Sequence, residues 1–169
     1  NSHGETTHDN YDMLDIPRVS FKLKNEKIRK IFCGWDNSLA INEDGEVLAW
    51  GNNKSYQCGV EIKEDDEKTK SISTPINITK AHNAPFKCID ASCGNEHTLV
   101  LSQEGEVYGF GLNVDGVLGI ENNFDYKISN FTKIHFDEKI KSISCGTVHN
   151  LALSQTGKVY SWGSAQGGQ

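Results

Sequence analysis

The chain has 169 residues, of which 36% are hydrophobic and 24% charged, and its formal net charge at pH 7 is −6. This length and composition suit one folded domain and exclude a chain too polar to form a core. The negative charge disfavours nucleic acid as a partner, because a phosphate-binding surface needs clustered lysine and arginine side chains. No apolar run is long enough to span a bilayer, so a membrane is not an expected partner either.

The first residues differ in composition from the rest of the chain. Residues 1–15 are polar and contain few apolar side chains, so we expect a disordered N-terminal segment there. The patterned sequence begins at residue 16, and residues 16–169 are expected to fold together.

The first predicted elements are short strands. An extended piece at 16–19 precedes a β-rich run at 28–32, and the apolar run at 39–41 has the length of a buried strand. A polar turn then ends in Gly45, where glycine supplies the positive φ of a tight hairpin. A further strand follows at once and closes at Gly51.

The same elements recur twice along the chain. The Cys-Gly pair that follows the β-rich run moves by 60 residues (33 to 93) and then by 52 (93 to 145). Extended pieces precede the second and third copies, at 74–78 and 130–134. Four short strands in each unit and no helical period predict β-propeller blades. A WD-type propeller is the nearest rival, but no unit closes on a Trp-Asp pair.

The third copy carries the clearest motif. It reads Cys-Gly-x-x-His-x-Leu-Ala-Leu, then Gly-x-Val-Tyr-x-Trp-Gly, and resembles the RCC1 (regulator of chromosome condensation) repeat family. The resemblance covers about 16–169, with repeats near 28–59, 86–119 and 140–169. It implies an all-β fold, a partial β-propeller of about three four-stranded blades from a ring of seven. The chain is then expected to be a piece of a larger protein, with self-association into a ring as the alternative.

Candidate site residues come from the loop after each Cys-Gly pair. His97 and His149 recur at one repeat position, while the first copy has Asn37 there. One interpretation is that each histidine orients a loop within its own blade. The other is contact with a partner, because the resemblance implies that this loop lies on the face that engages the Ran GTPase in the family's namesake. The candidate partner-binding residues are then Asp36, Glu96, His97 and His149. The third copy has no acidic residue before its histidine, which departs from the family pattern.

The sequence predicts no catalytic activity and no metal or cofactor site. No nucleophile and base stand at a recognised spacing and no metal-ligand cluster is visible, so we expect no enzyme activity, cofactor, metal or small-molecule substrate. None of the five cysteines forms a Cys-x-x-Cys pair, and all are expected to be reduced thiols in a cytoplasmic or nuclear protein. Those in the Cys-Gly pairs are expected to be small buried side chains. The charged segment 61–70 is interpreted as a solvated loop, with a partner-specific insertion as the alternative.

The sequence therefore predicts a protein–protein interaction module. The alternative is a guanine-nucleotide exchange factor for a Ran-like small GTPase, which would distort the nucleotide site of a bound protein. The second alternative is a chromatin-associated propeller, which the absence of lysine and arginine from the first 15 residues disfavours.

Overall fold

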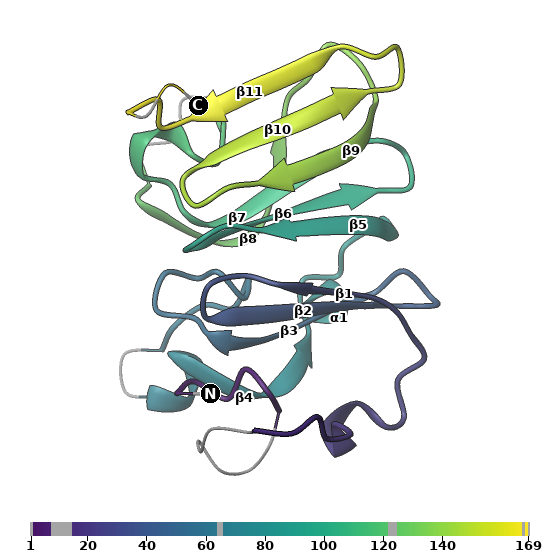
Figure 1. Ribbon diagram of the computed structural model, residues 1–169, viewed down its shortest axis with the longest axis vertical. Helices are drawn as coiled ribbons and strands as arrows, with labels where there is room; N and C mark the ends of the chain where they lie inside the picture. The colour runs from purple at the N-terminus through teal and green to yellow at the C-terminus, as the bar shows by residue number, and fades with distance from the viewer. Residues whose placement is uncertain (1, 8–14, 64–65, 122–124, 167, 169) are drawn as a thin grey trace.

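The structure is a computed structural model that describes residues 2–7, 15–63, 66–121, 125–166 and 168. Three antiparallel sheets follow one another in chain order and stack face to face (Figure 1). We call them the first, second and third blades. The first contains β1 (Ile28–Cys33), β2 (Asn37–Asn42), β3 (Val47–Asn52) and β4 (Ser71–Asn77). The second contains β5 (Cys88–Cys93), β6 (His97–Ser102), β7 (Val107–Leu112) and β8 (Lys127–Ile134). The third contains β9 (Ile140–Cys145), β10 (His149–Ser154) and β11 (Val159–Gly163).

The predicted all-β partial propeller is confirmed, with a correction to the strand count and order. The third blade has three strands among the described residues, not four. The fourth strand of each of the other blades also follows its hairpin: β4 pairs with β3, and β8 pairs with β7. The extended piece at 74–78, expected to open the second unit, thus completes the first blade. The piece at 16–19 forms no strand.

The few described helices lie outside the sheets, one before β1 and the others in connections between strands. They are short: η1 (Phe21–Leu23), η2 (Glu67–Thr69), α1 (Ile78–Ala81) and η3 (Val114–Gly116). The segment 61–70 includes η2, which begins after Asp66, whose side chain accepts a hydrogen bond from the Lys68 N–H. No helix in the described part of the chain is long and apolar enough to cross a membrane.

The turns between the second and third strands of each blade have the predicted geometry. Gly45, Gly105 and Gly157 have φ of +80°, +76° and +96°. Side chains other than glycine rarely adopt this backbone conformation, so the recurring glycine is explained by the hairpin.

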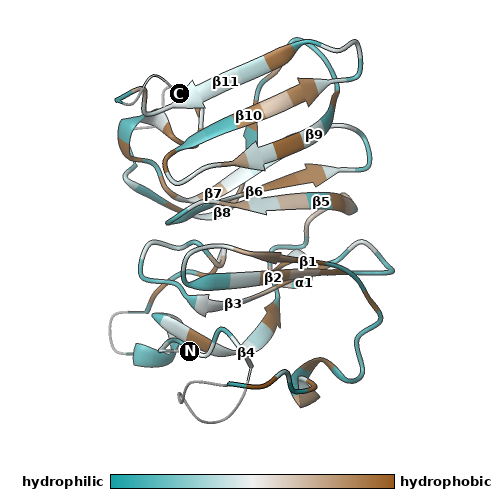
Figure 2. Cartoon of the chain, in the orientation of Figure 1, coloured by the Kyte–Doolittle hydropathy of each residue, from teal (hydrophilic) through white to brown (hydrophobic). Residues whose placement is uncertain are grey.

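The core lies between neighbouring sheets, where apolar strand segments face one another (Figure 2). Equivalent residues show how much each blade depends on the next. Val47 and Val107 are fully buried in the first and second blades, whereas Val159 in the third is 67% exposed. Leu151 is likewise exposed, although its counterparts in the other blades are buried. The outer face of the third blade therefore carries apolar side chains like those buried between the other blades. No described residues cover this face.

The cysteines only partly follow expectation. All five are free, but Cys33 is exposed and Cys93 and Cys145 are half-buried, because they end the first strands of the blades beside a shared hollow. Cys58 and Cys88 are the buried ones, and burial raises the pKa of the Cys88 thiol to about 12.

Part of the segment 1–15, which we expected to be disordered, has a described structure at residues 2–7. They lie against the first blade, where Ser38, Trp50 and Ser71 hydrogen-bond to their backbone carbonyls. Backbone groups of this segment satisfy polar side chains of the blade, which holds it in place despite its polar composition. Residues 8–14 lie outside the described residues.

Candidate functional site

The three loops that follow the first strand of each blade come together at one end of the stack. Two backbone hydrogen bonds join them: Trp35 N–H donates to Gly94 O at 3.4 Å, and Asn95 N–H donates to Thr147 O at 3.1 Å. We call residues 34–36, 94–96 and 146–148 the loop face. The first two residues of each loop, together with the neighbouring cysteines, line a hollow of about 280 Å³.

His97 lies beneath this face rather than on it. Its side chain is only 2% exposed, and its Nε2 atom lies 2.8 Å from Oδ1 of Asn150 in the third blade. The ring packs on Gly94 so closely that a Cβ atom built there would lie 2.0 Å from His97 Cε1. The interpretation of His97 as a structural residue is therefore supported, with a correction: it links two blades instead of orienting a loop within one.

The protonation state of His97 follows from this burial. Desolvation lowers the pKa of His97, the hydrogen bond to Asn150 raises it in part, and nearby His149 lowers it further. The ring is thus neutral near pH 7. Because Asn150 Oδ1 can only accept, the proton is on Nε2.

His149 occupies the same position in the third blade, where its surroundings differ. It is half-buried and packs on Gly146 as His97 packs on Gly94. No side-chain hydrogen-bond partner for its ring lies among the described residues. This matches the exposed outer face of the third blade, since His97 finds its partner in the blade that follows.

Asn37 takes the histidine position in the first blade. Its Nδ2 atom donates to Gln57 O at 3.2 Å and lies 3.4 Å from Thr98 Oγ1 in the second blade. Asn37 therefore reaches the next blade as His97 does. Its Oδ1 atom is buried and has no partner among the described residues, which is a cost that histidine would avoid.

Asp36 and Glu96, the acidic candidates, lie half-buried at the edge of the loop face. Glu96 Oε1 accepts a hydrogen bond of 2.9 Å from Ser55 Oγ, so it too joins two blades. Asp36 lies beside the N-terminal residues His3 and Glu5, and one ligand-type atom from each of the three lies within 4.8 Å of the others. Sequence spacing did not reveal this cluster, because Asp36 is 31 residues (5 to 36) from Glu5.

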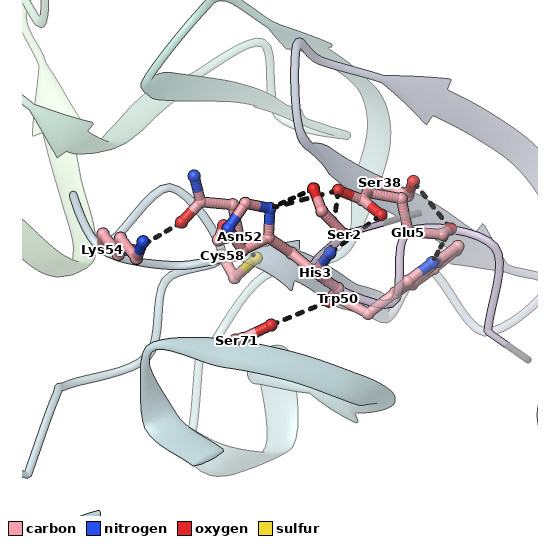
Figure 3. A network of polar contacts seen from close by, with 9 residues as sticks. All are labelled: Ser2, His3, Glu5, Ser38, Trp50, Asn52, Lys54, Cys58 and Ser71. Carbon is pink, nitrogen blue, oxygen red and sulfur yellow. Dashed lines mark hydrogen bonds and ion pairs between the residues drawn. The ribbon is translucent and has the colours of Figure 1, made fainter. Parts of the chain in front are cut away.

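The N-terminal segment contributes more of this region than its sequence suggested. Figure 3 shows His3, Glu5 and their neighbours against the first blade. Glu5 O accepts from Trp50 Nε1 at 2.6 Å and from Ser38 Oγ at 3.3 Å, while His3 O accepts from Ser71 Oγ at 3.0 Å.

Trp35 is the residue of the loop face that the sequence analysis missed. Its side chain is 75% exposed, although its backbone is held to the second blade. The signal was present, because the equivalent residues of the other copies are the polar Asn95 and Thr147. A tryptophan at a loop position where the other copies have polar residues is not expected to be part of a blade core.

The stacked antiparallel sheets, and the loops that meet at one end of them, define a β-propeller. Models of the regulator of chromosome condensation (RCC1) repeat match residues 44–101 and 104–153, and residues 28–57, 88–117 and 140–169. The chain belongs to the RCC1 repeat family.

Similar proteins place the chain within this family. It is 36% identical over 156 residues to protein pim1 of Schizosaccharomyces pombe, which covers 85% of this chain and 28% of pim1. It is 31% identical over 158 residues to the probable E3 ubiquitin-protein ligase HERC4 of Rattus norvegicus, covering 94% of this chain and 14% of HERC4. Among solved structures, Prp20p of Saccharomyces cerevisiae, described with its binding to Gsp1p and histones, matches with a TM-score of 0.69 and 28% identity. That match covers 81% of this chain and 33% of Prp20p. The chain thus spans a third or less of each.

Proposed function

We propose that this chain is part of an RCC1-type propeller that binds a protein partner through the loop face. The observation that carries the proposal is the exposure of Trp35 on a loop whose backbone is fixed to the next blade. A large, rigid side chain offers much apolar contact area and loses little conformational entropy on binding. The proposal needs no bond-making residue in the chain.

The surroundings of Trp35 add polar groups to the contact. Asp36 follows it directly, and Glu96 lies at the same position of the next blade. An apolar anchor with acidic groups around it resembles the centre and the rim of a protein interface. We therefore expect the partner to offer an apolar pocket for the indole and polar or basic groups near it.

The test compares two exposed aromatic side chains in the full-length protein that contains this segment. Trp35→Ala removes the proposed anchor, and Phe21→Ala is the matched control, since both are 75% exposed. We expect the wild type and Phe21→Ala to retain a partner at equal yield in quantitative pull-downs. Trp35→Ala should lose at least about tenfold of the affinity for that purified partner. Equal binding by the two variants would place the partner elsewhere.

Nucleotide exchange on a Ran-like small GTPase is the finer alternative. The similarity to pim1 and to Prp20p, which is described with Gsp1p, motivates it. The measurement is GDP release from a panel of purified small GTPases in the presence of the full-length protein. Acceleration that is lost in Glu96→Ala and kept in Glu96→Gln would support it, because glutamine can still accept the bond from Ser55. No acceleration by folded protein would leave a binding module of another kind.

Association with chromatin remains the second alternative. Binding to histones is stated for Prp20p, whereas the net charge of −6 opposes direct contact between this chain and DNA. Binding to histones that is weakened by Trp35→Ala would support it. Absence of binding to histones by the folded protein would contradict it.

A further inference from the structure

The loop after β3 contacts the second blade, and the loop after β7 contacts the third blade. Residues 2–7 contact the first blade in the same way. The shared feature is one backbone carbonyl in each loop. Gln57 O accepts from Thr98 Oγ1 at 2.8 Å, and Val117 O accepts from Asn150 Nδ2 at 2.6 Å. The repeat offsets relate Thr98 and Asn150 to Ser38 (38 to 98 is 60, 98 to 150 is 52). Ser38 Oγ donates to Glu5 O, and Glu5 precedes Gln57 by 52 residues (5 to 57).

A second donor reaches the same carbonyl. Trp162 Nε1 donates to Val117 O at 3.0 Å, and its counterpart Trp50 donates through Nε1 to Glu5 O at 2.6 Å. The second blade has Phe110 at this position, which carries no N–H group. Two side chains of the first blade therefore bind Glu5 O as the corresponding two of the third blade bind Val117 O.

The loops also share a turn. Thr7 N–H donates to Gly4 O at 2.9 Å, as Gly59 N–H donates to Tyr56 O at 2.8 Å. The first residue of each of these turns has positive φ, +82° at Gly4 and +64° at Tyr56. In the loop after β7, the Gly119 N–H donates the same hydrogen bond to Gly116 O at 2.9 Å.

The residues before the turn agree as well. The His3 N–H donates to the Glu5 carboxylate at 3.2 Å, and the equivalent Ser55 N–H donates to Gln57 Oε1 at 2.9 Å. Such agreement in backbone, side-chain and dihedral detail is not expected of a polar segment that rests on a sheet by chance.

We infer that residues 2–7 are the closing loop of a further RCC1 repeat, and that the first blade carries a binding site for such a loop. The repeat models begin at residue 28 and do not include this segment. The ligand of the site is a turn with a residue of positive φ, followed by a carbonyl that faces Ser38 and Trp50. In this chain the site is filled by the chain's own residues.

The tight fit at Gly4 provides a test with a matched control. A Cβ atom built on Gly4 would lie 2.8 Å from Ser73 Cα, a backbone atom of β4 that cannot move freely. Gly168 occupies the equivalent repeat position of the third blade with the same φ of +82°, yet a Cβ atom there would meet nothing within 4 Å. Gly4→Ala and Gly168→Ala thus share the backbone penalty and differ in docking alone.

The readout is hydrogen exchange at the indole N–H groups in the 169-residue chain. The chain has three tryptophans: Trp50 reports on Glu5, Trp162 reports on Val117, and exposed Trp35 is the unprotected reference. Each NMR signal is assigned from a Trp→Phe variant. We expect Trp50 and Trp162 to be protected relative to Trp35. Gly4→Ala should reduce the protection of Trp50 at least about tenfold and leave Trp162 unchanged.

Two results would overturn the inference. One is exchange of the Trp50 indole as fast as that of Trp35 in the unmodified chain. The other is an equal effect of Gly4→Ala and Gly168→Ala on Trp50. If Gly4→Ala does not fold, Ser38→Ala replaces it, because this substitution removes only the hydroxyl that donates to Glu5 O. A selective loss of Trp50 protection is again the expected result, and an unchanged Trp50 is the contrary one.

Discussion

His97 in the second blade donates a hydrogen bond of 2.8 Å through Nε2 to Oδ1 of Asn150 in the third, and Asn150 Nδ2 in turn donates to Val117 O in the second. Asn150 thus bonds to two groups of the second blade across the junction, and all of these groups are buried. A buried polar pair of this kind costs stability when one partner is removed, because the other loses its hydrogen bond without regaining water.

The first prediction concerns this pair. His97→Ala should lower the free energy of unfolding by about 2 to 3 kcal/mol, the combined cost of a cavity and an unsatisfied Asn150 oxygen. His149→Ala is the control, because that ring is half-buried and has no described hydrogen-bond partner, and it should cost about 1 kcal/mol or less. Urea unfolding followed by fluorescence measures the free energy of unfolding of both variants. Similar decreases for the two variants would show that the hydrogen bond between blades contributes little to the effect of His97.

The second prediction concerns pH. Burial lowers the pKa of His97 in the folded chain, so the unfolded chain, with a histidine pKa near 6.5, binds the proton more readily. The contribution of neutral His97 is therefore complete above about pH 6.5 and decreases as the pH falls toward the folded-state value. Unfolding free energies between about pH 7.5 and 5.5 should fall more steeply for the wild type than for His97→Gln. Equal slopes would indicate an unperturbed histidine.

The third prediction replaces Asn37 with the histidine that the other two repeats carry at this position. Asn37→His should raise the free energy of unfolding by about 1 kcal/mol, because it removes the unpaired Oδ1 and places an N–H group toward Thr98 Oγ1. Thermal unfolding measures the gain, with Asn37→Ala as the variant that loses the link altogether. A loss of stability in Asn37→His would mean that the hydrogen bond to Gln57 O matters more.

The fourth prediction concerns Glu106, a half-exposed acid at the opposite end of the blade. Hydrogen bonds from Lys133, Tyr108 and Lys139 lower the pKa of Glu106 to about 2. Its contribution to stability is present above the unfolded value near 4.3 and is lost as the pH falls toward 2. NMR titration of the carboxyl carbon should show the low midpoint, and Lys133→Met should raise it. Added salt should weaken the effect because the group is accessible to solvent. A midpoint above 4 would contradict the ion-pair geometry.

The fifth prediction compares equivalent valines. Val107→Ala should cost about 2 kcal/mol, since the side chain is fully buried, whereas Val159→Ala should cost less than about 0.5 kcal/mol at 67% exposure. Urea unfolding at several protein concentrations measures both. A large, concentration-dependent cost at Val159 would show that a second copy covers the outer face of the third blade.

The parts of the fold that depend on local sequence patterns could be predicted from the sequence. The hairpins, their glycine turns and the three strands next to each Cys-Gly pair follow from short-range alternation and from the period. The pairing of β4 could not be found this way, because a strand between two hairpins can join either neighbour, and only packing decides. Burial of His97 also depends on a residue 53 positions away, Asn150. The role of residues 2–7 could have been found, because the 52-residue offset extended back from Tyr56 and Gln57 lands on Gly4 and Glu5.

The order of the strands also affects how such a chain can lengthen. The unit that the repeat model matches, residues 44–101, contains β3 and β4 of one blade and β5 and β6 of the next. It therefore also contains the contact between Gln57 and Thr98 that joins these two blades. A duplication of this unit in the gene copies a junction together with both of its sides, rather than a finished sheet that must find a fitting neighbour. New blades can thus arise already compatible with the old ones.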